Sequence, residues 1–501
     1  MILKNKNYLE LENIFQEASD LNNILKISQW DFATKLKKGS AISRQKEMAT
    51  LAATIHKIKS NSNIENLIER SLQEQEFLNK WQKSNLLLIK KQFDASKIIP
   101  VKMIQDYNEA SSRCEFLWRD CRKNNDFKSL APHFDKLFSL ARKIVTIKSD
   151  HFGIPKYDIL IDQFDPERKF GDLKPIFQQI KRKLPDLINK IIEKQSVEKF
   201  IPLKEKIDKG TQRKIEIRLM EIMGFNLLKG RLDESSHPFC GGSEDDTRIT
   251  TTYHEKDFLN SSYSVIHELG HGLYQQNLPV KYRGQPVGEF KGFSFHESQS
   301  RIMEVQIGTS PAFLEFYAKL IRDEFGVKGE EYNAENLFKL KTRVQPGLIR
   351  IDADEVTYPM HVILRSEIEE KIINAEIKAI DIPDIWNKKM QEYLGIMPDC
   401  YSNGCLQDMH WPSGLFGYFP CYIVGSLIAS MLMKKIRYEN CSVNDQIEAS
   451  DFKKINSYLN TNLREFGSIY SSSDLLFKST GEKSLNTDTF FEHIKEKYIN
   501  Y

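Results

Sequence analysis

The strongest constraint on the fold is a series of long, charged stretches in which apolar residues recur every three or four positions. They fill roughly the first 230 residues, and two examples are ISRQKEMATLAATIHKIK at 42–59 and NLIERSLQEQEFLNKWQKSNLLLIKKQF at 66–93. This spacing is typical of an amphipathic helix with one apolar face. The sequence therefore predicts a mainly α fold.

Length, charge and cysteine content narrow the class of protein to which this chain can belong. A chain of 501 residues suffices for two or three domains or for one large helical body. Its net charge of +3 is spread over a large surface, so we expect no nucleic-acid partner. The seven cysteines are odd in number and include no CxxC pair, which indicates reduced thiols. The N-terminus resembles neither a signal peptide nor a transit peptide. Together with the reduced thiols, it predicts a cytoplasmic protein.

One uncharged stretch has the length of a membrane span. It is GLFGYFPCYIVGSLIASMLM, residues 414–433. Pro420, three glycines and two tyrosines interrupt it, and the chain has no second stretch of this kind. We therefore predict a buried core helix and no membrane partner.

The composition changes at residues 231–260. Glycines and turn formers in RLDESSHPFCGGSEDD precede a β-branched run, RITTTY at 248–253, which predicts a loop followed by a short strand. Helical spacing resumes at residue 261, where Ser261 or Ser262 is the expected N-cap.

Two histidines four residues apart lie in SVIHELGHGLYQQ, residues 264–276. On a helix, His267 and His271 share a face and can bind one Zn²⁺. Glu268 can then reach a metal-bound water as a general base. The motif predicts a zinc-dependent hydrolase, although cobalt or manganese would also suit such ligands. The alternative is a pair of histidines on a buried helix.

A catalytic zinc site needs a third protein ligand. The candidate segments are HEKDF at 254–258, expected to be a loop, and FHESQSRIMEVQIG at 295–308, which has helical spacing. The second lies far enough downstream to form a separate helix that faces the histidines. We therefore choose Glu297, which gives a His₂Glu site with one open position. The alternative role for Glu297 is an ion pair with Arg301.

Several motifs together resemble one known family. In order, HELGHGLYQQ, HESQS, IRIDADEVTYPMHVILR at 349–365 and GCLQDMHW at 404–411 resemble the motif set of the thermostable, Taq-type metallocarboxypeptidases. Upstream, HPF and DTRIT resemble two further motifs of that family, so the resemblance covers nearly the whole chain. It implies a large helical peptidase body with a deep central groove, similar to angiotensin-converting and neurolysin-type peptidases, with a small β element near the site and usually as a homodimer.

The resemblance divides the chain into two regions of one continuous fold. Residues 1–230 would form one side of the groove, and residues 231–501 would be the catalytic, metal-binding region. Its substrates would be peptides with a free C-terminal carboxylate.

The resemblance also indicates substrate residues. Arg350 would bind the C-terminal carboxylate with its planar fork, unless it pairs with Asp354. His361 or Tyr358 would donate a hydrogen bond to the developing oxyanion, and we prefer His361 as the catalytic residue.

Other motif residues have two possible roles. His237 and Arg248 would line the groove or brace its loop, and Tyr422 would contact substrate or pack in the core. The cluster Gln407, Asp408, His410 and Trp411 is interpreted as groove wall or support for the site. As partners of the ligand histidines we name Asp354 and Asp246.

Together these features predict a broadly specific metallocarboxypeptidase that releases single C-terminal residues. A helical oligopeptidase or a dipeptidyl carboxypeptidase is the nearest alternative. A non-catalytic, zinc-stabilised interaction protein is a third reading, and it would require a closed four-ligand site.

Overall fold

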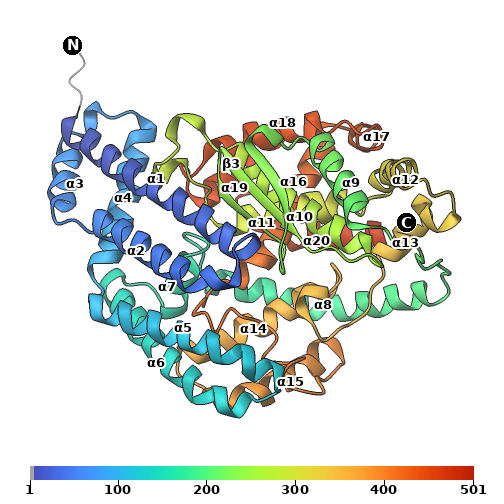
Figure 1. The fold of residues 1–501 in the computed structure, drawn as a ribbon, viewed down its shortest axis with the longest axis horizontal. Helices are drawn as coiled ribbons and strands as arrows, with labels where there is room; N and C mark the ends of the chain where they lie inside the picture. Colours follow the sequence, from blue (N-terminus) through green and yellow to red (C-terminus); the bar gives the residue numbers. More distant parts are fainter. Residues whose placement is uncertain (1–4) are drawn as a thin grey trace.

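The computed structural model describes residues 5–501, and most of its regular structure is helical (Figure 1). Within these residues, the helices before a small sheet are α1 (Lys6–Thr34), α2 (Ala41–Lys59), α3 (Asn63–Gln73), α4 (Lys80–Lys97), α5 (Val101–Lys123), α6 (Phe127–Phe152), α7 (Lys156–Asp162), α8 (Phe170–Ser196) and α9 (Lys209–Ile222). Those after it are α10 (Phe258–Gln276), α11 (Phe293–Arg301), α12 (Pro311–Phe325), α13 (Ala334–Lys341), α14 (Tyr358–Ile373), α15 (Ile382–Leu394), α16 (Pro420–Glu439), α17 (Val443–Glu448), α18 (Lys453–Asn462), α19 (Ser472–Thr480) and α20 (Thr487–Lys495). The predicted mainly α class is confirmed.

The sheet is larger than the sequence indicated. It contains β1 (Gly230–Glu234), β2 (Phe239–Ser243) and β3 (Asp246–Thr251) in the order β1-β3-β2. The strand β3 overlaps the β-branched run, but the segment predicted as a loop forms two further strands, parallel (β1) and antiparallel (β2) to β3. Gly242 explains the tight β2–β3 turn, because its φ of 84° suits glycine and a Cβ there would lie 2.0 Å from the Asp246 carbonyl oxygen.

The helix that carries the paired histidines, α10, begins earlier than predicted. Its N-cap is Asp257, whose side chain accepts a hydrogen bond from the backbone N–H of Asn260. Ser261, proposed as a cap, is buried inside the helix because Phe258 and Leu259 already pack into the core.

Most of the molecule shares one hydrophobic core. This core extends from Ala110 to Tyr498, and a smaller one lies among α1, α3 and α4. A minor cluster around Tyr282 connects α4 to the later chain, where Trp81 stacks on Tyr282 with ring centroids 4.4 Å apart. The main core thus extends across the boundary at residue 230, and the division into two groove-forming regions stays a prediction.

The uncharged stretch at 414–433 supplies a core helix, as predicted. Most side chains of α16 up to Met433 are buried, and the helix packs against α11, α14 and α20 near the centre of the molecule (Figure 1). In residues 5–501, no helix combines the length and apolar composition that crossing a bilayer would take.

The helices α10 and α11 approach each other backbone to backbone at Gly270. A Cβ on Gly270 would lie 2.3 Å from the Gln299 carbonyl oxygen and 2.5 Å from the Ser300 Cα. On the other side of α11, a Cβ on Gly425 of α16 would lie 2.7 Å from the Glu297 Cβ. Two glycines therefore set how closely α11 packs between its neighbours.

We expect Gly270→Ala to lower the thermal unfolding midpoint, because the added methyl group meets backbone that cannot move aside without shifting α11. Overpacking of this kind costs about 1–3 kcal/mol. Gly171→Ala is the matched control, since Gly171 is also helical but a Cβ there meets nothing within 4 Å. Equal midpoints for the two variants, measured by differential scanning calorimetry, would contradict the close approach.

Candidate metal centre and substrate site

Three side chains that the sequence singled out as ligands lie together where α10 packs on α11. His267 and His271 come from α10 and Glu297 from α11, and one donor atom of each lies within 4.8 Å of the others. The His271 Nε2 and Glu297 Oε2 atoms are 3.6 Å apart. Such separations suit donors that each bind one shared cation at about 2 Å. Two imidazoles and a carboxylate therefore fit a divalent metal ion.

The histidines are held through their other ring nitrogen. The His267 Nδ1 lies 2.8 Å from a carboxylate oxygen of Glu304, and the His271 Nδ1 lies 3.1 Å from the His296 carbonyl oxygen. Such contacts fix the tautomer that leaves Nε2 free for a metal. Glu304 lies in the π-helical turn Ile302–Ile307, directly after α11.

Glu304 is itself fixed by a neighbouring cation. Arg301 Nη1 donates to the same carboxylate oxygen over 3.0 Å. Burial acts to raise the pKa of Glu304, but Arg301 and His267 outweigh it and lower this pKa to about 2. Arg301 is thus paired with Glu304, whereas the sequence offered it as a partner of Glu297.

The predicted partners of the histidines, Asp354 and Asp246, are wrong. The Asp354 carboxylate accepts hydrogen bonds from the backbone N–H groups of Val356 and Thr357, before α14. The Asp246 carboxylate binds Arg248. Glu304 lies seven residues after Glu297 but within a π-helical turn, where α-helical spacing does not indicate which residues share a face.

Glu268 projects from α10 toward the edge of the sheet. Its side chain is buried, and α10 packs against β2, the strand that carries Cys240. Burial raises the pKa of Glu268 to about 7, although the neighbouring His267 acts against the rise. A carboxyl group with such a pKa can both accept and return a proton near neutral pH.

Arg350 occupies a buried position in a short 3₁₀ turn before α14. Its Nε atom donates to Asp408 over 3.0 Å and its Nη1 atom to the Tyr358 hydroxyl over 3.1 Å. Its Cζ atom lies 5.0 Å from the centre of the Tyr422 ring. The predicted alternative, a pair with Asp354, is therefore not formed.

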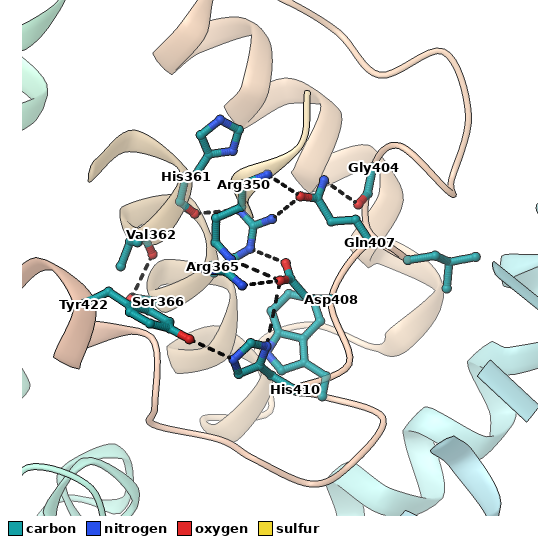
Figure 2. Close-up of polar contacts among 12 residues, drawn as sticks. Arg350, His361, Val362, Arg365, Ser366, Gly404, Gln407, Asp408, His410 and Tyr422 are labelled. Atoms are coloured by element: carbon teal, nitrogen blue, oxygen red, sulfur yellow. Dashed lines mark hydrogen bonds and ion pairs between the residues drawn. The ribbon is translucent and has the colours of Figure 1, made fainter. Parts of the chain in front are cut away.

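A second arginine shares the Asp408 carboxylate. Arg365 of α14 is fully buried and donates to Asp408 Oδ2 over 2.6 Å and to Gln407 Oε1 over 2.8 Å (Figure 2). Burial lowers the pKa of Arg365 to about 10 and that of His410 to about 4, so at neutral pH the arginine is charged and the histidine is not. Two cations facing one carboxylate leave this cluster with an excess positive charge.

His361 does not take the place expected of an oxyanion donor. Its side chain is fully buried, and neither ring nitrogen has a hydrogen-bond partner among the described residues. Figure 2 shows the ring directed away from Arg350 and Asp408, while its carbonyl oxygen accepts from Arg365. Burial lowers the pKa of His361 to about 3. The predicted catalytic role is not supported, because no ring atom is accessible.

The other candidate donor, Tyr358, lies one turn earlier, at the start of α14. Its hydroxyl accepts a hydrogen bond from Arg350 over 3.1 Å. The Tyr358 and Tyr422 rings pack edge to face with centroids 6.0 Å apart.

The HPF and DTRIT motifs lie at the sheet. Arg248 is engaged twice, since its Nε atom donates to Asp246 over 3.0 Å and its Cζ atom lies 4.2 Å from the centre of the Trp30 ring on α1. Bracing is therefore the role that its contacts favour. His237 is exposed between β1 and β2, where its carbonyl oxygen accepts from Ser235 and Thr250.

Comparisons with known proteins point to one family. The family model described as carboxypeptidase Taq (M32) metallopeptidase matches residues 10–498. Thermostable carboxypeptidase 1 of Pyrococcus furiosus is 30% identical over 94% of both chains, and carboxypeptidase 1 of Bacillus subtilis is 28% identical over 98% of both.

The fold itself has close solved counterparts. The structure of Trypanosoma cruzi metallocarboxypeptidase 1 superposes with a TM-score of 0.96 at 34% identity, covering 99% of this chain and 100% of that one. The resemblance inferred from the motifs is thereby confirmed, and the enzyme is a metallocarboxypeptidase. The chain belongs to the carboxypeptidase Taq (M32) metallopeptidase family.

Proposed function

We propose that the enzyme removes single residues from peptides with a free C-terminal carboxylate, with one divalent cation, best fitted by Zn²⁺, held by His267, His271 and Glu297. The observation that carries this proposal is the convergence of these three donors beside Glu268. Among residues 5–501 no fourth His, Cys, Asp or Glu joins the group. A metal ion held by three protein ligands keeps one coordination position open. This supports catalysis and argues against a purely structural zinc site.

The peptide bond would be attacked by water. When bound, the cation lowers the pKa of a coordinated water and polarises the scissile carbonyl group. A carboxylate oxygen of Glu268 takes a proton from the attacking water and returns it to the nitrogen of the leaving amine. The Tyr358 hydroxyl, which contacts Arg350, would donate a hydrogen bond to the developing oxyanion in place of His361.

Recognition of the C-terminus would come from the arginine cluster. Arg350 and Arg365 share only Asp408, and an incoming carboxylate would balance the remaining charge. Arg365 is fully buried, whereas Arg350 retains 7% of its side-chain exposure, so Arg350 is the residue that would contact substrate. Tyr422 flanks the guanidinium group. A site with a fixed cation favours an exopeptidase, because an internal peptide bond offers no carboxylate.

Two further expectations accompany this function. Seven free thiols support a cytoplasmic location. The homodimer that the family resemblance implies stays a prediction, which sedimentation velocity on the purified protein would test.

We expect Glu268→Gln to keep its metal and to lose turnover by about 10²–10⁴-fold, the usual contribution of a general base. Metal content would be measured by mass spectrometry of the digested protein, and turnover with an N-blocked dipeptide. Glu255→Gln is the control, because Glu255 lies exposed in the loop before α10 and should leave both quantities unchanged. Near-normal turnover in Glu268→Gln would contradict the assignment.

We expect Glu304→Gln to weaken metal binding by about 10–100-fold, since an uncharged amide holds the His267 imidazole less firmly. The measurement is competition with a chromogenic chelator. The exposed Glu315→Gln on α12 should bind as the unaltered protein does. Identical affinities for the two variants would show that Glu304 does not support the metal ligand.

The mode of cleavage is tested with one N-blocked peptide, prepared with a free and with an amidated C-terminus. Single residues should be lost only from the free form, and a chelator should abolish their loss. Mass spectrometry of the products distinguishes the alternatives. Internal cuts, or equal cleavage of both forms, would indicate an oligopeptidase. Absence of cleavage despite bound metal would indicate a structural site.

A further inference from the structure

A buried ionic cluster joins the end of the chain to two parts of the active site. The segment formed by α20 and the following π-helical turn, Glu496–Asn500, supplies His493, Lys497 and Tyr498, and all three contact Glu355. Figure 1 shows α20 near the central helix α16, against which it packs.

The contacts of Lys497 reach the metal side. Its ammonium group donates to the Glu355 carboxylate over 2.7 Å and to the Val305 carbonyl oxygen over 3.1 Å. Val305 follows Glu304 directly in the π-helical turn, and its carbonyl oxygen also accepts from the Thr309 hydroxyl over 2.7 Å. Lys497 thus holds the turn at the residue next to the carboxylate that orients His267.

The contacts of Glu355 reach the substrate side. Glu355 lies between the 3₁₀ turn that begins at Arg350 and the start of α14 at Tyr358. Its carboxylate accepts from Lys497, from His493 over 2.7 Å and from Tyr498 over 3.1 Å. Burial acts to raise the pKa of Glu355, but Lys497 and His493 hold it well below its usual range. The carboxylate is therefore charged and firmly held.

The buried charges of this cluster indicate a role beyond packing in the core. Lys497 and Glu355 have side chains that are each 7% exposed, and an apolar pair would fill such a volume without the cost of removing two charges from water. Unlike an apolar side chain, an ammonium group can donate hydrogen bonds to two acceptors at once, here one on each side of the site.

We propose that Lys497 is a positioning residue, which fixes the π-helical turn bearing Glu304 and thereby the imidazole of His267 at the metal centre. The inference rests on the proposed metal site. It assigns to the C-terminal segment, far from the motifs in sequence, a share in the affinity for the metal ion.

The experiment measures Zn²⁺ affinity of the full chain by competition with a chromogenic chelator. Lys497→Met, which keeps the length of the side chain and removes the donor, is expected to raise the dissociation constant about tenfold, within the range for partners of ligand residues. Lys497→Arg, which keeps donors and charge, should recover most of the affinity. Lys495→Met is the matched control, because Lys495 is exposed two residues earlier and should bind as the unaltered protein does.

Two further variants separate positioning from a general loss of stability. Leu11→Ala, in the small core of α1, α3 and α4, should lower the unfolding midpoint without changing Zn²⁺ affinity. In a Glu304→Gln background, Lys497→Met should cause no further loss of affinity, because the two residues act through the same contact.

The outcomes are distinct. An unaltered dissociation constant in Lys497→Met, or an additive loss in the double variant, overturns the role of Lys497 and leaves the metal site in place. Failure of the unaltered protein to bind Zn²⁺ overturns the proposed metal site, and the inference with it.

Discussion

The close packing of α10 against α11 is the constraint on which the rest of the site depends. The donor atoms of a metal centre must meet within a few ångströms, and here they come from two helices separated in sequence by loops. Gly270 allows the two backbones to touch, and Gly425 allows α16 to approach α11 from its other side. Because α11 is confined between glycines, Glu297 has little freedom to move away from His267 and His271. The geometry of the donors is therefore a property of the core.

Charge is organised in two separate clusters around this contact. At the metal side, Glu304 is held between His267 and Arg301, so that the support of the imidazole is an anion already compensated by a cation. At the start of α14, where we propose that substrate binds, Arg350 and Arg365 outnumber their single partner, Asp408. In the first cluster the negative charge is compensated, which suits a rigid support for a metal ligand. In the second, positive charge is in excess, which suits the binding of an anion.

The sequence predicted what depends on local spacing. Helical periodicity, the HExxH pair and the choice of Glu297 over the HEKDF loop all follow from which residues share a helix face. Features that depend on the tertiary fold were missed or misplaced. Glycine-rich residues before β3 form strands only because β3 and α10 provide a partner and a cover. Glu304 reaches His267 through a π-helical turn, and no spacing rule revealed that Arg365 and Asp408 would meet. His361 has the residue type of a catalytic donor, but α14 directs its ring into the core.

The contact between α1 and the sheet differs in kind from the packing elsewhere. Arg248 and Arg231 lie against the Trp30 ring, and Lys35 pairs with Asp233 over 2.9 Å. On the following helix, α2, no side chain is buried. This attachment thus relies partly on the charges of Lys35 and Arg231, whose side chains are about half exposed, and interactions of exposed charges weaken as ions screen them. High ionic strength would therefore weaken the attachment of α1 to the sheet, while the apolar contacts that hold α10, α11 and α16 together are maintained.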